Sequence, residues 1–424
     1  MSLEDLILVS VDDHIIEPPD LFAKHTPSRW LDRAPRLVYN PETKLQSWRW
    51  EGGASFAPFL NAVVTLPKDE WGFDPSSLHE IRPAAYDVDL RVRDMDANGI
   101  LASMCFPSFP GFSGYFFARA KDKELAYACL QAYNDWHIDE WCGRHPGRFI
   151  PLALPAIWDP ELAAQEARRV ARKGAKAIAF SEDPPAMGFP SIHSGLWDPF
   201  FAACVEEDLT LAIHIGSAFS GDNPPFYGKD APIDVMVTLP CWNSLPCAAH
   251  FLTSKVLLKF PELRIALSEG GTSWIPGFLD RMERHYEHQR WTGWDLGGLS
   301  PTELFQRHFL SCFVCDPSGL LLRDRIGADN IAYEVDYPHS DCTWPESPEE
   351  IWRHFELAQC SDEEIEKISH GNALRWLRAD PFRAIPREHA TVGALRSRAK
   401  DVDLRTRSKA EYRSAYERQH GAIA

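Results

Sequence analysis

Short runs of apolar residues alternate with amphipathic stretches along most of the chain. The apolar runs are rich in Ile, Leu, Val and Ala and show little polar alternation, which is typical of strands that are buried on both faces. Eight runs predict strands, over residues 7–11, 101–106, 149–154, 175–180, 210–215, 264–267, 309–314 and 331–335.

Amphipathic segments between most of these strands predict helices. The clearest spans residues 160–173, because Pro160 lies in its first turn and Gly174 follows its last periodic position. Strict alternation of strands and helices favours a parallel (β/α)8 barrel, and an open doubly wound sheet is the alternative. The other predicted helices cover residues 125–142, 198–207, 244–259, 277–290 and 317–325.

Three segments interrupt the alternation. Residues 17–93 are rich in Pro, Trp and Phe, and we expect them to form a cap inserted after strand one of a single barrel domain, residues 1–380. Residues 216–240 form a second long loop, after strand five. Residues 381–424 are rich in Arg and predict a C-terminal helical extension, packed on the barrel or on another subunit.

Composition narrows the class of protein. A chain of 424 residues with 45% hydrophobic residues has enough material for a large core, and its net charge of −17 argues against nucleic acid as a partner. No apolar run reaches the eighteen residues that a membrane helix needs. The N-terminus carries acidic residues where a signal peptide would be basic, so we predict a cytoplasmic protein.

The ten cysteines are scattered, which is typical of reduced thiols rather than of a disulfide framework. Cys312 and Cys315 have the CxxC spacing, but they fall on or beside a predicted strand. Residues three apart in a strand point to opposite faces. We therefore expect neither a redox nor a zinc role for this pair.

Polar side chains gather where the predicted strands end. Asp12 and His14 are two residues apart in strand one, so their side chains point to the same side. His214, Glu269 and Asp336 close strands five, six and eight, and the working residues of barrel enzymes stand at these C-terminal ends. Each has an ordinary alternative as a hydrogen-bonded histidine, a helix cap or a turn residue. Their joint placement favours a metal site, and imidazoles with carboxylates suit zinc, manganese or iron.

The same positions carry a resemblance to the amidohydrolase-related group that includes aminocarboxymuconate-semialdehyde decarboxylase. The likeness extends over residues 7–377, and its motifs are specific in this order and spacing. They are Val11-Asp12-Asp13-His14 with Glu17-Pro18, Asp94-Met95-Asp96-Ala97-Asn98-Gly99-Ile100, Ile213-His214-Ile215-Gly216, Glu269-Gly270-Gly271-Thr272-Ser273-Trp274-Ile275-Pro276, Asp336-Tyr337-Pro338-His339-Ser340-Asp341 and Gly371-Asn372-Ala373.

The resemblance implies a distorted barrel that holds one divalent metal on Asp12, His14, His214 and Asp336, with zinc expected first and manganese or iron as alternatives. It also implies decarboxylation of a small, often aromatic, carboxylic acid. Two positions depart from the group: Asp12 stands where many relatives carry His or Glu, and Glu269 stands where the decarboxylases commonly carry His.

Three functions remain open at this point. In a decarboxylase, Asp336 would deliver a proton to carbon, with Glu269 as the second candidate. In a hydrolase of a C–N, C–O or C–C bond, the two carboxylates would serve a metal-activated water. In a non-catalytic binding protein, protein groups would fill every metal position. We favour decarboxylation narrowly, and we expect a homo-oligomer because the cap and the extension need a surface on which to pack.

Five further residues are candidates for the substrate pocket or for support of the metal ligands. His339 is predicted to contact Asp336 or substrate, and Glu17 to enter the metal sphere or hold His14. Trp274 and Trp344 are predicted to wall the pocket, and Arg82 to clamp a substrate carboxylate. Each has an ordinary alternative. His339 could be a turn residue and Glu17 a partner of the loop backbone. The two tryptophans could be plain core residues, and Arg82 could form an ordinary ion pair.

Overall fold

The computed structural model describes residues 1–51, 53–54, 61–72, 77–218 and 232–420. By contacts the chain divides into two compact units, which are described separately below. The first comprises residues 1–151, 335–349 and 381–424, and the second comprises residues 152–334 and 350–380.

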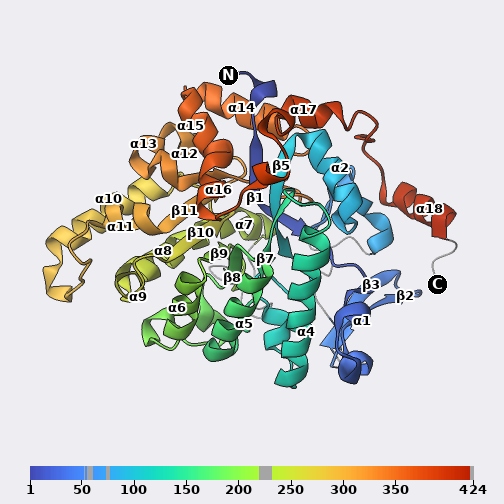
Figure 1. The fold of residues 1–424 in the computed structure, drawn as a ribbon, viewed down its shortest axis with the longest axis horizontal. Coiled ribbons are helices and arrows are strands. Elements are labelled where there is room, and N and C mark those ends of the chain that lie inside the picture. The colour runs from blue at the N-terminus through green and yellow to red at the C-terminus, as the bar shows by residue number, and fades with distance from the viewer. Residues whose placement is uncertain (52, 55–60, 73–76, 219–231, 421–424) are drawn as a thin grey trace. The chain divides into compact units, whose positions relative to one another are not determined.

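The second unit is built on a six-stranded parallel sheet in the order β12-β11-β10-β9-β8-β7. Its strands are fully buried except for the first residue of β10, which explains why their sequences show no polar alternation. Figure 1 shows the helices of this unit, among them α5, α6 and α8, along the outer side of the strands. The strands are β7 (Leu152–Ala153), β8 (Ala177–Phe180), β9 (Thr210–His214), β10 (Arg264–Ser268), β11 (Phe309–Phe313) and β12 (Ile331–Tyr333).

The helices of this unit follow local end signals. Helix α5 (Pro160–Lys173) has the predicted bounds, because Asp159 accepts two backbone N–H groups at its start and Gly174 adopts φ 109° at its end. The predicted helix 244–259 is divided into α8 (Ser244–Thr253) and α9 (Val256–Lys259) at Ser254, which is extended. The others are α6 (Asp198–Glu206), α10 (Ile275–His288), α12 (Pro317–Leu321), α13 (Arg323–Ile326) and α14 (Ser347–Leu357), which begins in the first unit.

The first unit contains a parallel sheet of β1 (Leu8–Ile15), β5 (Ile100–Pro107) and β6 (Phe149–Ile150). Residues 335–337, which follow β12 (Ile331–Tyr333) after Glu334, run beside β1. The Asp336 N–H donates to the Asp12 carbonyl (2.8 Å), and the His14 N–H donates to the Tyr337 carbonyl (2.6 Å). Within this unit, therefore, the chain after strand eight is hydrogen-bonded to strand one.

All eight predicted strands are confirmed in the described residues. The third is divided at Pro151 into β6, which pairs with β5, and β7, which pairs with β8. Proline has no N–H for a sheet ladder, so it separates the two short segments. The predicted loop 216–240 contains helix α7 (Ile233–Thr238), and its residues 219–231 lie outside the described part of the chain.

The cap contains a small antiparallel sheet of β2 (Arg36–Asn40), β3 (Leu45–Trp50) and β4 (Gly53–Ala54), which the sequence did not predict. Strand β2 alternates exposed and half-buried residues and has no buried position, so its pattern lacks the contrast that marks a buried strand. Trp48 anchors the cap, because its buried ring stacks on Phe109 of the loop after β5, with ring centroids 4.6 Å apart.

The C-terminal extension, with helices α17 (Val392–Ser397) and α18 (Lys409–His420), packs on the cap and on α2 (Val88–Asn98) of its own unit (Figure 1). The Arg407 N–H donates to the Thr65 carbonyl (2.9 Å), and Arg413 pairs with Glu80. Gly99, at φ 72°, lies where a Cβ would be 2.9 Å from Val392. The cap and the extension thus cover each other, which removes the reason we gave for expecting a homo-oligomer.

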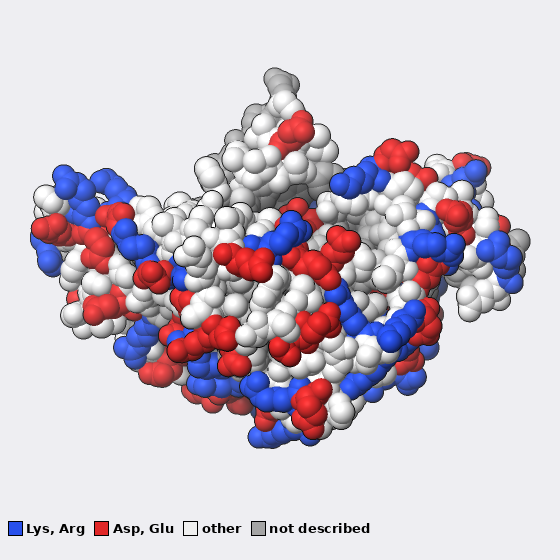
Figure 2. All heavy atoms as spheres, turned by 90° about the horizontal axis from the view of Figure 1, so that it is seen from above, with Lys and Arg blue, Asp and Glu red and all other residues white. Residues whose placement is uncertain are grey.

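Acidic and basic side chains are interspersed over the face shown in Figure 2, rather than separated into patches of one sign. None of the described helices has both the length and the apolar character needed to cross a bilayer.

Candidate functional site

Three of the four predicted metal ligands lie together in the first unit. The Nε2 atom of His14 is 3.5 Å from Asp12 Oδ1 and 3.1 Å from Asp336 Oδ1. Asp12 and His14 point to the same side of β1, as the two-residue spacing predicts. The side chains of all three are at most 1% exposed, so two carboxylates and an imidazole meet in a buried site.

His339 supports this cluster from the turn after Asp336. Its Nδ1 atom is 2.7 Å from Asp336 Oδ1, and its ring stacks on His14 with centroids 3.8 Å apart. The structure thus places His339 against a predicted ligand, and the ring of Phe112 lies 5.1 Å from His14 on the same cluster.

Asp13 holds the two halves of this cluster together, a role that we did not assign from the sequence. It lies between Asp12 and His14 and accepts hydrogen bonds from the Tyr337 N–H (3.0 Å) and from Ser10 Oγ (3.1 Å). Burial raises the pKa of Asp13, while the charge of Arg91 and these hydrogen bonds act against the rise. The doubled aspartate before His14 was the available signal, since alternate residues of a strand face opposite sides.

In the second unit, His214 ends β9, Glu269 directly follows the neighbouring strand β10, and their side chains face each other. His214 Nε2 is 3.5 Å from Glu269 Oε2. The other ring nitrogen, Nδ1, lies 2.5 Å from the Ile215 carbonyl, which can only accept. The hydrogen therefore belongs on Nδ1, and the neutral ring carries on Nε2 the lone pair with which a histidine binds a metal.

Glu334 positions Glu269, and sequence reasoning missed it. Its fully buried carboxylate accepts the Glu269 N–H at 2.9 Å. Glu269 and Asp336 have φ values of 54° and 61°, in the left-handed region that is costly for residues other than glycine. Such backbone strain clusters at functional sites, so it is consistent with the catalytic roles predicted for these two carboxylates.

Glu17 is a partner of the loop backbone after β5, the alternative that we gave to a role at the metal. Its carboxylate accepts the N–H groups of Ser108 (3.0 Å) and Phe109 (2.8 Å). Burial raises the pKa of Glu17 to about 7, and these backbone hydrogen bonds limit the rise. Glu17 therefore shapes the loop that carries Phe112.

The structure gives Arg82 and Trp344 partners other than the substrate pocket that we predicted for them. Arg82 makes two hydrogen bonds to Asp94, at 2.5 and 2.7 Å, so its guanidinium serves an internal ion pair rather than a substrate carboxylate. Trp344 lies beneath that guanidinium, 4.5 Å from ring to Cζ, and donates to the Asp94 carbonyl. Tyr337 Oη also donates to Asp94, at 2.7 Å. Asp94 is thus the centre of a buried structural cluster.

Trp274 closes the turn after β10 instead of standing free at a pocket. Its indole N–H donates to the carbonyls of Gly270 (2.9 Å) and Gly271 (3.1 Å). Its ring packs against Phe278, with centroids 5.4 Å apart. The side chain therefore stabilises the segment that follows Glu269.

The donor chemistry of the first-unit cluster fits a divalent cation. Two buried carboxylates around one imidazole carry excess negative charge, which a cation would neutralise. Separations of 3.1 and 3.5 Å between donor atoms are those expected of ligands about 2.1 Å from a common ion. A carboxylate and histidine set is suited to zinc, manganese or iron.

Comparison with known proteins decides the family. The amidohydrolase family model matches residues 76–379. The chain belongs to the amidohydrolase family. Four gamma-resorcylate decarboxylases align with it, among them that of Polaromonas sp., which is 24% identical over 318 residues, or 72% of this chain and 92% of the relative. This amidohydrolase is accordingly an enzyme. The sequence motifs predicted a likeness to decarboxylases of this superfamily, and the relatives confirm that prediction.

Solved structures support the fold. An amidohydrolase from Mycobacterium avium subsp. paratuberculosis has a TM-score of 0.67 at 21% identity, covering 88% of this chain and 99% of its own. The 5-carboxyvanillate decarboxylase of Novosphingobium aromaticivorans, solved with manganese and 4-hydroxy-3-methoxy-5-nitrobenzoic acid, has a TM-score of 0.60 at 20% identity, covering 89% and 100%. The fold of this amidohydrolase is therefore the (β/α)8 barrel that the strand pattern predicted, in the distorted form that the family resemblance implied.

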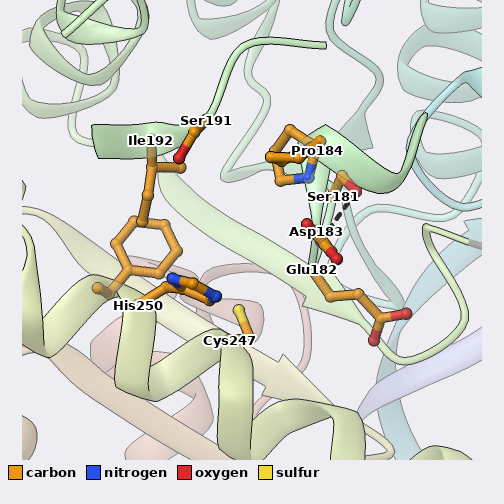
Figure 3. Close-up of a pocket in the computed structure, with 10 residues that line it drawn as sticks. Ser181, Glu182, Asp183, Pro184, Ser191, Ile192, Cys247 and His250 are labelled. Carbon is orange, nitrogen blue, oxygen red and sulfur yellow. Dashed lines mark hydrogen bonds between the residues drawn. The ribbon is translucent and has the colours of Figure 1, made fainter. Parts of the chain in front are cut away.

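A small pocket in the second unit of the amidohydrolase lies between the loop after β8 and helix α8. Figure 3 shows Cys247 and His250 on the helix side, and the Glu182 carboxylate turned away from His250. The Glu182 N–H donates to Ser217 Oγ (2.9 Å), so this residue contacts the loop that follows His214. Burial raises the pKa of Glu182 to about 8, and the nearby groups of Ala218, Gly216 and Asn243 act in the opposite direction.

Proposed function

We propose that this amidohydrolase is a metal-dependent carboxy-lyase that removes CO₂ from a small aromatic carboxylic acid. The observation that carries the proposal is the buried cluster of Asp12, His14 and Asp336, with donor atoms 3.1 and 3.5 Å apart. The decarboxylase names of the relatives support the reaction class.

We propose His214 as the fourth ligand. Its Nε2 lone pair supports this role, as does its place at the end of β9 in a barrel whose strand ends carry the working residues. A divalent metal on these four residues would polarise the oxygens of a bound carboxylate and stabilise negative charge. We expected zinc first, and the manganese in a solved relative supports manganese equally well.

The reaction also needs a carboxyl group of the protein that delivers a proton to the substrate. Decarboxylation breaks the bond between the ring carbon and the carboxyl carbon, and the ring carbon must take up a proton as CO₂ leaves. Asp336 is the proton donor that we propose, and His339, whose Nδ1 atom is 2.7 Å from Oδ1, would orient its carboxyl group. Glu269, whose backbone Glu334 fixes, is the second candidate.

The substrate class that we propose is a hydroxylated benzoic acid. The relatives' names specify resorcylate, 2,6-dihydroxybenzoate and 5-carboxyvanillate. In this chain the half-buried ring of Phe112, 5.1 Å from His14, offers an aromatic surface beside the cluster. A ring stacked there would bring its carboxylate close to the predicted ligands.

Hydrolysis is the second candidate function, and the proximity of Glu269 to His214 favours it. A carboxylate 3.5 Å from this imidazole stands where the decarboxylases commonly carry histidine. Glu269 and Asp336 could divide the base and acid roles of water attack between them.

Two measurements test the proposal. Purified protein should contain at least about one transition metal per chain, and a panel of hydroxybenzoates should release CO₂. Asp336→Asn should lower kcat by roughly 10²–10⁴-fold, the usual contribution of a general acid. Turnover of esters, amides or diketones without CO₂ release would replace the lyase by the hydrolase.

A matched pair of histidine variants tests the ligand set. His214→Ala should lose the metal and remain folded, whereas His193→Ala, an exposed histidine of the same unit, should keep it. Equal metal contents in the two variants would remove His214 from the site.

A further inference from the structure

A second group of metal-binding side chains lies in the second unit, on different elements from the site above. Cys315 follows β11, and Glu350 and His354 are one turn apart on α14. One donor atom from each residue lies within 4.8 Å of the other two. None of the three belongs to the predicted catalytic set.

The distances in this group match those between ligands of a tetrahedral cation. His354 Nε2 is 3.8 Å from Cys315 Sγ and 3.3 Å from Glu350 Oε1. Zinc ligands about 2.3 Å (sulfur) and 2.0–2.1 Å (nitrogen, oxygen) from the metal are about 3.6 and 3.3 Å apart at tetrahedral angles. A single ring nitrogen faces both partners, and one hydrogen on it cannot serve both, whereas one cation can.

The chain holds the three donors in place before any cation binds. Asp316, next to Cys315, accepts the N–H groups of Thr272 (2.6 Å) and Gly319 (3.0 Å), which fixes the loop. Arg353 contacts Glu350 Oε2, so the other oxygen, Oε1, is the one that faces His354. Residues four apart on a helix share one face, the spacing that places two ligands on one metal.

Burial also favours the metal-binding form of His354. His354 is 8% exposed, and burial lowers its pKa, although the charge of Glu350 acts in the opposite direction. A neutral imidazole has the lone pair that a metal needs. Cys315 is exposed, so a cation can reach the group from solvent.

We propose that Cys315, Glu350 and His354 form a second cation site, which binds a thiophilic divalent metal such as Zn²⁺. Three protein ligands leave the fourth position open to water or to a small anion. The bound ion would link α14 to the loop between β11 and α12. Cys312 takes no part, because its side chain is buried within β11.

Cobalt titration of the reduced full-length protein tests the site. Co²⁺ bound to a thiolate gives a near-ultraviolet charge-transfer band, which the sulfur-free catalytic set cannot produce. Wild type should show this band. Cys315→Ser should abolish it, and Glu350→Gln and His354→Gln should each weaken Co²⁺ binding by at least about tenfold.

Cys360→Ser is the matched control, since Cys360 lies on the same unit outside the group, and its band should equal that of wild type. Circular dichroism checks that each variant is folded, and Glu350→Gln replaces His354→Gln if the buried histidine is needed for folding. Absence of the band in wild type, or its persistence at full strength in Cys315→Ser, would overturn the proposal. Unchanged affinity in Glu350→Gln would do the same.

Discussion

The imidazole of His339 stacks on that of His14, with ring centroids 3.8 Å apart and an interplanar angle of 26°. Both rings also contact the same oxygen of Asp336, through His14 Nε2 at 3.1 Å and His339 Nδ1 at 2.7 Å. One carboxylate is therefore oriented by two stacked rings, of which only His14 is a predicted ligand.

His339→Phe should separate the stacking role of this residue from its polar contact with Asp336. The phenyl ring keeps the stack on His14 but places no ring nitrogen beside Asp336 Oδ1. We expect metal content to be kept, kcat to fall about 10–100-fold and the pH–rate profile to shift, as for the loss of a group that orients a ligand. Steady-state kinetics and elemental analysis test this, and a wild-type profile and rate would show that His339 is only a packing residue.

Metal removal should lower thermal stability, because the cation neutralises the buried carboxylates of Asp12 and Asp336. At a free metal concentration of 100 times Kd, binding stabilises the folded state by about 2.7 kcal/mol. Thermal unfolding with chelator, and then with added Mn²⁺ or Zn²⁺, measures the difference. Asp12→Asn should shrink it, whereas Asp20→Asn, on an exposed residue, should leave it unchanged. An equal Tm with and without metal would show that a bound cation does not stabilise the folded protein.

Arg82→Leu should destabilise the fold without a selective effect on substrate binding. The change leaves the Asp94 carboxylate, 4% exposed, without its bidentate partner. Removing one member of a buried ion pair costs about 3–5 kcal/mol, whereas Arg405→Ala breaks an exposed pair and should cost at most about 1 kcal/mol. Urea unfolding measures both. A raised KM with unchanged stability would restore Arg82 as a substrate clamp.

Glu182 should make stability fall as pH rises. Its pKa is raised from 4.5 to about 8 in the folded state, so the native protein holds this proton more tightly than the unfolded chain does. The contribution is fully present below pH 4.5 and is lost between about pH 4.5 and 8. Glu182→Gln should therefore flatten the pH dependence of Tm in this window, and Glu161→Gln, on an exposed residue, should not. Parallel curves for Glu182→Gln and wild type would show that the pKa of this carboxyl is the same in the folded and unfolded states.

Two glycines should respond oppositely to alanine. A Cβ on Gly319 would lie 1.8 Å from Thr272 Oγ1, inside the hydrogen-bonded turn around Asp316, whereas a Cβ on Gly277 would meet nothing within 4 Å. Gly319→Ala should cost about 1–3 kcal/mol through overpacking. Gly277→Ala, within α10, should gain about 0.5–1 kcal/mol through helix propensity. Chemical denaturation of both variants measures the contrast, and a neutral Gly319→Ala would show that the turn can relax.

Local patterns were enough to predict much of the fold. Strand burial removes polar alternation, and helix ends such as Asp159 and Gly174 carry their own hydrogen-bonding chemistry, so strands and helices could be located from neighbouring residues alone. The short strands of the cap were missed because β2 has no buried position and therefore no such contrast.

The candidate site was predictable only in part. Asp12 and His14 share a strand face, a relationship that the two-residue period determines directly. Asp13, Glu334 and Asp94 act through partners that are distant in the chain, such as Tyr337, Glu269 and Arg82. No short-range pattern distinguishes a buried carboxylate that orients a backbone from one that binds a metal.

The sequence by itself determined the order of strands and helices, the residue types at the strand ends and the family, because all of these depend on local periodicity and on motif spacing. Only the tertiary structure decided which charged groups are already neutralised by partners. Arg82 illustrates the difference: its charge is plain in the sequence, but its pairing with Asp94 depends on chain segments that folding brings together. The electrostatic role of a side chain is set by burial and by its neighbours, and both exist only in the folded protein.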